Sequence, residues 1–79
     1  MKIEVRLFAS LGAYLPDHKI GDPSFIEVKP EVTVGHILAR LKVPTDIPKM
    51  IFINGRRGSA ENMVYEGDRL GIFPLIAGG

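Results

Sequence analysis

The chain has 79 residues, of which 46% are hydrophobic and 24% are charged, and its net charge at pH 7 is +1. These values are typical of one small globular domain, and they exclude a disordered polar chain and a strongly basic surface for nucleic acid or an anionic membrane. Cysteine is absent, which excludes disulfides, thiolate nucleophiles and cysteine zinc sites.

The first residues, MKIEVRLFA, alternate between apolar and charged side chains. This pattern differs from the continuous apolar segment of a secretory signal, and no apolar run approaches the roughly 20 residues that span a bilayer. We therefore expect a cytoplasmic protein with neither a membrane nor a nucleic acid as its partner.

The first predicted strand covers residues 2–8, KIEVRLF, in which apolar and charged residues alternate strictly. Such alternation indicates a strand that is buried on one face. Residues 9–23 contain two glycines and two prolines, which predict a long connection without regular structure. Within it, Leu11, Tyr14 and Leu15 are expected to cap the core.

Residues 25–30, FIEVKP, resume the alternating pattern, with Ile26 and Val28 facing inward. Pro30 lacks a main-chain N–H group and so ends the pairing. We expect this second strand to form a hairpin with the first.

A change of period in TVGHILARLKVP predicts a short amphipathic helix of about three turns. Thr33 is a suitable N-cap, and Lys42 followed by Pro44 marks the end. The apolar stripe that should pack on the sheet consists of Val34, Ile37, Leu38 and Leu41.

The run MIFI at residues 50–53 is short and continuously apolar, which predicts a strand buried on both faces, and the following Asn-Gly pair is a strong signal for a tight turn. A weaker strand is expected around 63–65, then a turn at 66–68 and a last strand at 69–73. The predicted fold class is α+β, with a small mixed sheet packed on one helix.

Few side chains in this sequence are suited to catalysis. His18 lies in the turn-rich connection and His36 on the helix surface, and isolated histidines in such places are typically solvated rather than bases or metal ligands. Asp68 should bond the local backbone. Arg56 and Arg57 belong to a solvated turn and could also meet an acidic partner surface. We expect no catalytic residue, metal or bound cofactor.

The C-terminal residues, FPLIAGG, suggest another kind of site. We expect residues 1–73 to form the domain and residues 74–79 an extended tail, whose six residues reach about 20 Å. Two glycines without Cβ atoms would let the tail enter a narrow channel. The residues expected to bind a partner are Phe73, Pro74, Leu75, Ile76, Ala77 and Gly78, with the apolar Leu75 and Ile76 as anchors.

In the order of its elements and in size, the whole chain resembles the MoaD/ThiS family of ubiquitin-like sulfur carrier proteins, which have the β-grasp fold. The similarity is most specific in VRLFASL (5–11), TVGHILARL (33–41), EGDRLGIFP (66–74) and the terminal AGG (77–79).

The resemblance implies that Gly79 is adenylated by an E1-like enzyme and converted to a thiocarboxylate, which then donates sulfur. ATP would be used by that enzyme rather than bound by this chain. The length and the Phe-Pro before the tail are most similar to the small subunit of molybdopterin synthase, which implies a large subunit as partner and a role in molybdenum cofactor biosynthesis.

Three alternatives stay open at this point. The sulfur could serve thiamine thiazole synthesis or another thiolation pathway. Gly79 could instead form isopeptide bonds with lysines, as in a ubiquitin-like protein modifier. Finally, the domain could be a simple interaction module whose tail has no role.

Overall fold

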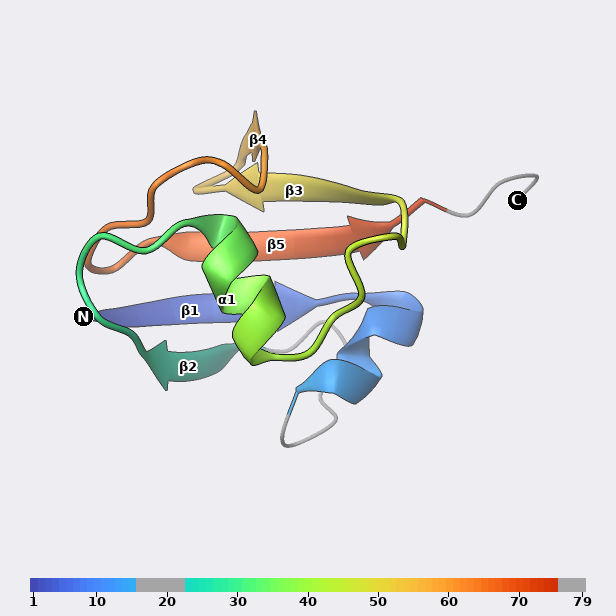
Figure 1. Ribbon diagram of the computed structural model, residues 1–79, viewed down its shortest axis with the longest axis horizontal. Coiled ribbons are helices and arrows are strands. Elements are labelled where there is room, and N and C mark those ends of the chain that lie inside the picture. Colours follow the sequence, from blue (N-terminus) through green and yellow to red (C-terminus); the bar gives the residue numbers. More distant parts are fainter. Residues whose placement is uncertain (16–22, 76–79) are drawn as a thin grey trace.

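The computed structural model describes residues 1–15 and 23–75, which form one mixed sheet with α1 lying across one of its faces (Figure 1). The strands are β1 (Lys2–Leu7), β2 (Ser24–Glu27), β3 (Lys49–Ile53), β4 (Arg56–Gly58) and β5 (Arg69–Pro74). The helices are α1 (Val34–Arg40) and the short 3₁₀ helix η1 (Ala9–Tyr14).

The strand order is β2-β1-β5-β3-β4, with β1 and β5 parallel at the centre and the other pairs antiparallel. β1 and β2 form the expected antiparallel pair, in which Ile3 lies opposite Ile26. The chain then passes through α1 before it returns as β3, on the other side of β5. The α+β class and the mixed sheet expected from the sequence are therefore confirmed.

The core lies between α1 and the sheet, as the alternation in the strands and the helical stripe require. Leu38 is 6% exposed and Leu41 is partly buried against the cluster. The fully buried large side chains, all below 2% exposure, are Ile3, Val5, Leu7, Leu11, Leu15, Val34, Ile37, Val64, Leu70 and Ile72. The predicted helix face is confirmed by these residues.

α1 begins with a capping box that the sequence did not reveal in full. The Thr33 hydroxyl accepts a hydrogen bond from the His36 N–H at 3.2 Å, and the Thr33 N–H donates to His36 Nδ1 at 3.1 Å. The two bonds satisfy the main-chain N–H groups of His36 and Thr33, which have no acceptor within the helix at its start.

α1 is shorter than the expected three turns because the chain reverses directly after Leu41. Lys42 adopts a left-handed conformation (φ 64°), and the N–H of the buried Val43 donates to the Leu38 carbonyl at 3.0 Å. This is the Schellman arrangement that ends helices. Neither α1 nor η1, in the part of the chain that the structure describes, has the length and apolarity to cross a bilayer.

The connection after β1 is more regular than predicted. Ala9–Tyr14 forms η1, in which the Leu11 N–H donates to the Phe8 carbonyl. Short 3₁₀ segments need few hydrogen bonds, so Gly12 does not prevent one. Leu11 and Leu15 are buried and Tyr14 is partly buried, as expected for residues that cap the core.

Two predictions about the later strands are wrong. β3 is buried on one face only, because α1 covers a single face of the sheet; Ile51 is buried, whereas Phe52 is only partly covered. The weak strand lies at β4, directly after the Asn-Gly turn, and Met63 forms only an isolated bridge with Thr33. β4 has only three residues, two of which are arginine, so its sequence is too short to show the alternation that predicts a strand.

Candidate functional site

The site begins where β5 ends. Pro74 still pairs with Lys49, one residue beyond the expected domain boundary, because a strand end tolerates a residue that has no N–H to donate. The Leu75 N–H then donates to the Pro48 carbonyl at 2.9 Å. Leu75, one of the two expected anchors, is 47% exposed, and Phe73, another residue expected to bind a partner, is 37% exposed, so both present apolar surface.

The other predicted tail residues, Ile76, Ala77, Gly78 and Gly79, lie outside the described residues. Their conformation and contacts are therefore not part of the site as described here, and the role of Gly79 stays a prediction. The last residue that the structure describes, Leu75, directly follows the C-terminal end of β5.

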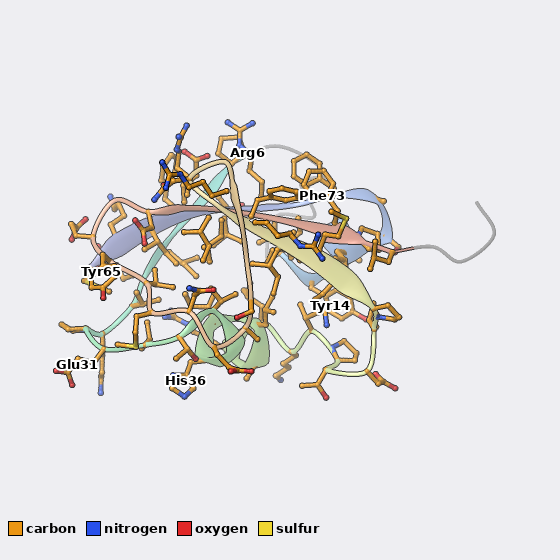
Figure 2. The ribbon with its side chains drawn as sticks, turned by 90° about the horizontal axis from the view of Figure 1, so that it is seen from above. Arg6, Tyr14, Glu31, His36, Tyr65 and Phe73 are labelled. Carbon is orange, nitrogen blue, oxygen red and sulfur yellow. The ribbon has the colours of Figure 1, made fainter. Side chains whose placement is uncertain are left out.

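Phe73 belongs to a cluster of three aromatic rings on the face of the sheet opposite α1. Its ring stacks on that of Phe8, with centroids 4.1 Å apart and planes inclined by 3°. The ring of Phe52 meets it edge-on, at 5.7 Å and 88°. We call Phe8, Phe52 and Phe73 the aromatic patch. Figure 2 shows Phe73 and Arg6 on this face, with α1 and His36 on the other.

The register of the strands explains why the aromatic patch has a depression beside it. Arg6 lies opposite Gly71 on β5, and Gly71 lies opposite Phe52 on β3, so a residue without a side chain separates two large ones. A Cβ atom at Gly71 would lie 3.7 Å from the Phe8 ring and 3.8 Å from the Phe73 ring. The resulting open depression has a volume of about 410 Å³.

Charged side chains surround the apolar floor of this depression. The Arg6 Nε donates to the Glu4 carboxylate at 3.0 Å, and Arg69 also lines the depression. Arg57 extends the same row, because it lies opposite Phe52 on β4. An apolar centre with a charged rim is the usual composition of a protein-binding surface.

Two other candidate residues from the sequence, Asp68 and His36, serve the local structure. Asp68 accepts from the Tyr65 N–H at 2.8 Å and from Asn54 Nδ2 at 3.0 Å, so it bonds the local turn as expected. His36 is exposed on α1, and His18 lies outside the described residues. Among residues 1–15 and 23–75, no three His, Cys, Asp or Glu side chains gather in a way that could hold a metal ion.

Sequence reasoning missed Phe8 and Phe52. Phe8 continues the series of outward-facing residues Lys2, Glu4 and Arg6 at a spacing of two. This spacing could have predicted that its ring lies on the same outer face. A continuous apolar run such as MIFI predicts burial on both faces, so the sequence gives no sign that Phe52 is partly exposed.

Comparison with known proteins identifies the family of this chain. A family model described as Mut7-C ubiquitin matches residues 1–78. No curated protein matches the sequence.

Solved structures with the same fold cover nearly the whole chain. SAMP1 from Haloferax volcanii is 22% identical, with a TM-score of 0.74 and full coverage of both chains. A putative molybdopterin converting factor subunit 1 from Pyrococcus furiosus is 20% identical, with a TM-score of 0.69, and the match covers 96% of this chain and 99% of that one.

A third similar structure is a complex of subunits 1 and 2 of the molybdopterin-converting factor from Helicobacter pylori. The match has 20% identity, a TM-score of 0.60 and full coverage of both chains. Together with the family model, these structures confirm the ubiquitin-like β-grasp fold that the sequence resemblance implied, and the similar structures include a putative subunit 1 of the molybdopterin converting factor.

Proposed function

Because the chain belongs to the Mut7-C ubiquitin family, whose model matches residues 1–78, we propose that it is a sulfur carrier that presents its last residue to partner enzymes. In this role Gly79 is adenylated by an E1-like enzyme and converted to a thiocarboxylate. The chain is then a cosubstrate rather than a catalyst.

The observation that carries the proposal is the position of the aromatic patch at the exit of the tail. Phe73 is both the centre of the patch and the residue before Pro74 and Leu75, where the chain leaves the sheet. A partner that covers the patch is thereby placed next to the first tail residues. Buried aromatic side chains supply much of the binding energy at protein interfaces, so one docking event can position the tail for chemistry.

The chemistry requires nothing from the side chains of this domain. The carboxylate of Gly79 attacks ATP on the activating enzyme, which gives an acyl-adenylate and pyrophosphate. Sulfide then displaces AMP and leaves a C-terminal thiocarboxylate. Glycine at positions 78 and 79 keeps Cβ atoms out of the enclosing site, where they would crowd the nucleotide.

The proposal includes a second partner that receives the sulfur. The Helicobacter pylori structure contains subunit 1 of the molybdopterin-converting factor together with subunit 2, and this chain has the fold found there. We therefore propose a molybdopterin synthase large subunit as the recipient, with molybdenum cofactor biosynthesis as the pathway. The same aromatic patch would serve both partners in turn, since each must hold the tail.

Reconstitution tests this proposal. Incubation with a cognate E1-like enzyme, ATP and sulfide should exchange one oxygen for sulfur in the last peptide, as measured by intact mass and by fragmentation. A variant with one residue added after Gly79 should not react, and Gly79→Ala should react more slowly. If the extended variant were thiolated at the wild-type rate, Gly79 would not be the reacting residue.

A second candidate function is that of a ubiquitin-like protein modifier. It is favoured by the similarity to a structure described as the Haloferax volcanii small archaeal modifier protein 1, with 22% identity and a TM-score of 0.73. A modifier forms isopeptide bonds, so target proteins would gain mass in cells that express the wild-type chain. Such adducts would disappear when Gly79 is deleted, whereas a pure carrier would give none.

A further inference from the structure

Two prolines lie at the point where β5 ends and the tail begins. β5 runs between β1 and β3, so its main-chain groups bond alternately to one neighbour and to the other (Figure 1). Pro74 is the last residue of β5, and Pro48 directly precedes β3. Because proline has no N–H group, it cannot donate to a ladder. Both ladders of β5 therefore lack a donor at this end.

The antiparallel ladder between β3 and β5 lacks its donor at Pro48. Bonded pairs alternate along such a ladder, and each pair normally exchanges two N–H···O=C bonds. At one end of the ladder the Asn54 N–H donates to the Arg69 carbonyl at 2.8 Å. At the other end, in the same phase, the Leu75 N–H donates to the Pro48 carbonyl at 2.9 Å. Pro48 cannot return this bond, so the Leu75 carbonyl accepts nothing from residue 48.

The parallel ladder between β1 and β5 lacks its donor at Pro74. The Phe8 N–H donates to the Ile72 carbonyl at 3.1 Å. With this register, the Phe8 carbonyl would next accept from residue 74, which has no N–H. The Phe8 carbonyl accepts instead from the Leu11 N–H of η1, at 3.1 Å. Within the described residues, this ladder ends at the bond that Ile72 accepts.

Leu75 is consequently held to the two ladders by a single main-chain bond, the one from its N–H to Pro48. Its side chain is 47% exposed, so apolar packing adds little to this bond. One main-chain hydrogen bond changes an equilibrium by about fivefold, which corresponds to about 1 kcal/mol. A partner can therefore release Leu75 from the sheet easily and gain about 3.4 Å of extended chain.

The segment before β3 holds Pro48 in place opposite Leu75. The Pro44 carbonyl accepts from the Ile47 N–H at 3.5 Å and from Lys49 Nζ at 3.3 Å. Pro48 itself is exposed, so its ring contributes little to the core. An alanine at this position could keep the same main-chain path and direct its N–H at the Leu75 carbonyl.

We propose that Pro48 is a positioning residue, which leaves the last pair of the β3–β5 ladder half-bonded so that an enzyme can draw Leu75 off the sheet together with the residues after it. Pro74 acts at the same point from the side of β1, where η1 already occupies the Phe8 carbonyl. The proposal rests on the proposed function, because release of Leu75 matters only if an enzyme binds the end of the chain.

The test restores the missing donor. In Pro48→Ala, amide hydrogen exchange measured by NMR should show a protected amide at position 48 and about fivefold slower exchange of the Leu75 amide. With the E1-like enzyme, ATP and sulfide, kcat/KM for thiolation should fall by about fivefold. The loss should lie in KM rather than in kcat, because the extra bond must break before the tail is bound.

Pro44→Ala is the matched control. Pro44 is also exposed and belongs to the same segment, but it does not lie opposite Leu75. Either substitution removes one proline and gives the unfolded chain similar additional freedom, which urea unfolding measures. Pro44→Ala should exchange its Leu75 amide and undergo thiolation as the parent does.

The two measurements separate this proposal from the function on which it rests. If the wild-type chain is not thiolated, the sulfur-carrier function fails, and the exchange data still decide whether Pro48 weakens the last pair. If the wild type reacts and Pro48→Ala reacts equally fast despite a protected new amide, the carrier function stands and the positioning role of Pro48 is overturned. An unprotected amide at position 48, or equal slowing in Pro44→Ala, would also overturn that role.

Discussion

The ring of Phe8 lies parallel to that of Phe73, with centroids 4.1 Å apart, and so joins the segment after β1 to the last residues of β5. The stacked rings lie on the face of the sheet that α1 does not cover (Figure 2). It therefore contributes less to the core than to the shape of the surface from which the tail departs.

Phe73→Ala should reduce partner binding much more than it reduces stability. Phe73 is 37% exposed, so we expect a loss of about 1 kcal/mol in the free energy of unfolding, well below the 3 to 5 kcal/mol of a fully buried phenylalanine. Binding to the E1-like enzyme, measured by calorimetry, should fall by about a hundredfold. Phe25→Ala on β2 is the control, and a similar loss of binding there would contradict a specific role for the aromatic patch.

Leu38→Ala should destabilise the domain by about 2 to 5 kcal/mol, because Leu38 is almost fully buried between α1 and the sheet. Urea unfolding measures this change. The exposed Glu61→Ala should stay within about 0.5 kcal/mol of the parent. A Leu38→Ala protein as stable as the Glu61 variant would mean that the packing of α1 is wrong.

Thr33→Ala should lower the free energy of unfolding by about 0.5 to 2 kcal/mol, because it removes the oxygen that accepts from the His36 N–H. Thr33→Ser keeps that oxygen and should lose much less. Comparison of the two urea midpoints decides whether the hydroxyl or the methyl group of Thr33 stabilises α1.

Gly55→Ala should cost about 1 kcal/mol although no atom lies within 4 Å of the added Cβ. The cause is the backbone, since Gly55 has φ 83° in the turn between β3 and β4. Gly55→Asn should be tolerated better because asparagine adopts left-handed conformations more readily. Equal stability of Gly55→Ala and the parent would show that this turn relaxes into another conformation.

Local patterns predicted most of this fold. The alternation in residues 2–8 and the apolar stripe of Val34, Ile37 and Leu38 each require one buried face, and the structure buries those faces. Asp68 and the Asn-Gly turn were also predicted correctly, because short polar side chains and glycine act on the backbone nearest to them.

The aromatic patch could not be obtained in the same way. It depends on the register that brings Gly71 opposite both Arg6 and Phe52, and register is a property of strand pairing rather than of any single segment. The apolar run MIFI would look the same in the sequence whether the second face of its strand were covered by a helix or exposed for a partner to bind. The capping role of His36 was hidden for a related reason, since a histidine can replace the usual Glu or Gln at that position only if its ring reaches back to Thr33.

The central claim is tested most directly by the mass of the C-terminal peptide in protein isolated from the native host under reducing conditions. Our account predicts that a fraction of the chains ends at Gly79 as a thiocarboxylate, heavier than the free acid by the difference between one sulfur and one oxygen, and that this fraction disappears when the E1-like enzyme is deleted. A terminal peptide that carries only the free acid in both strains, or a chain that continues past Gly79, would contradict the account.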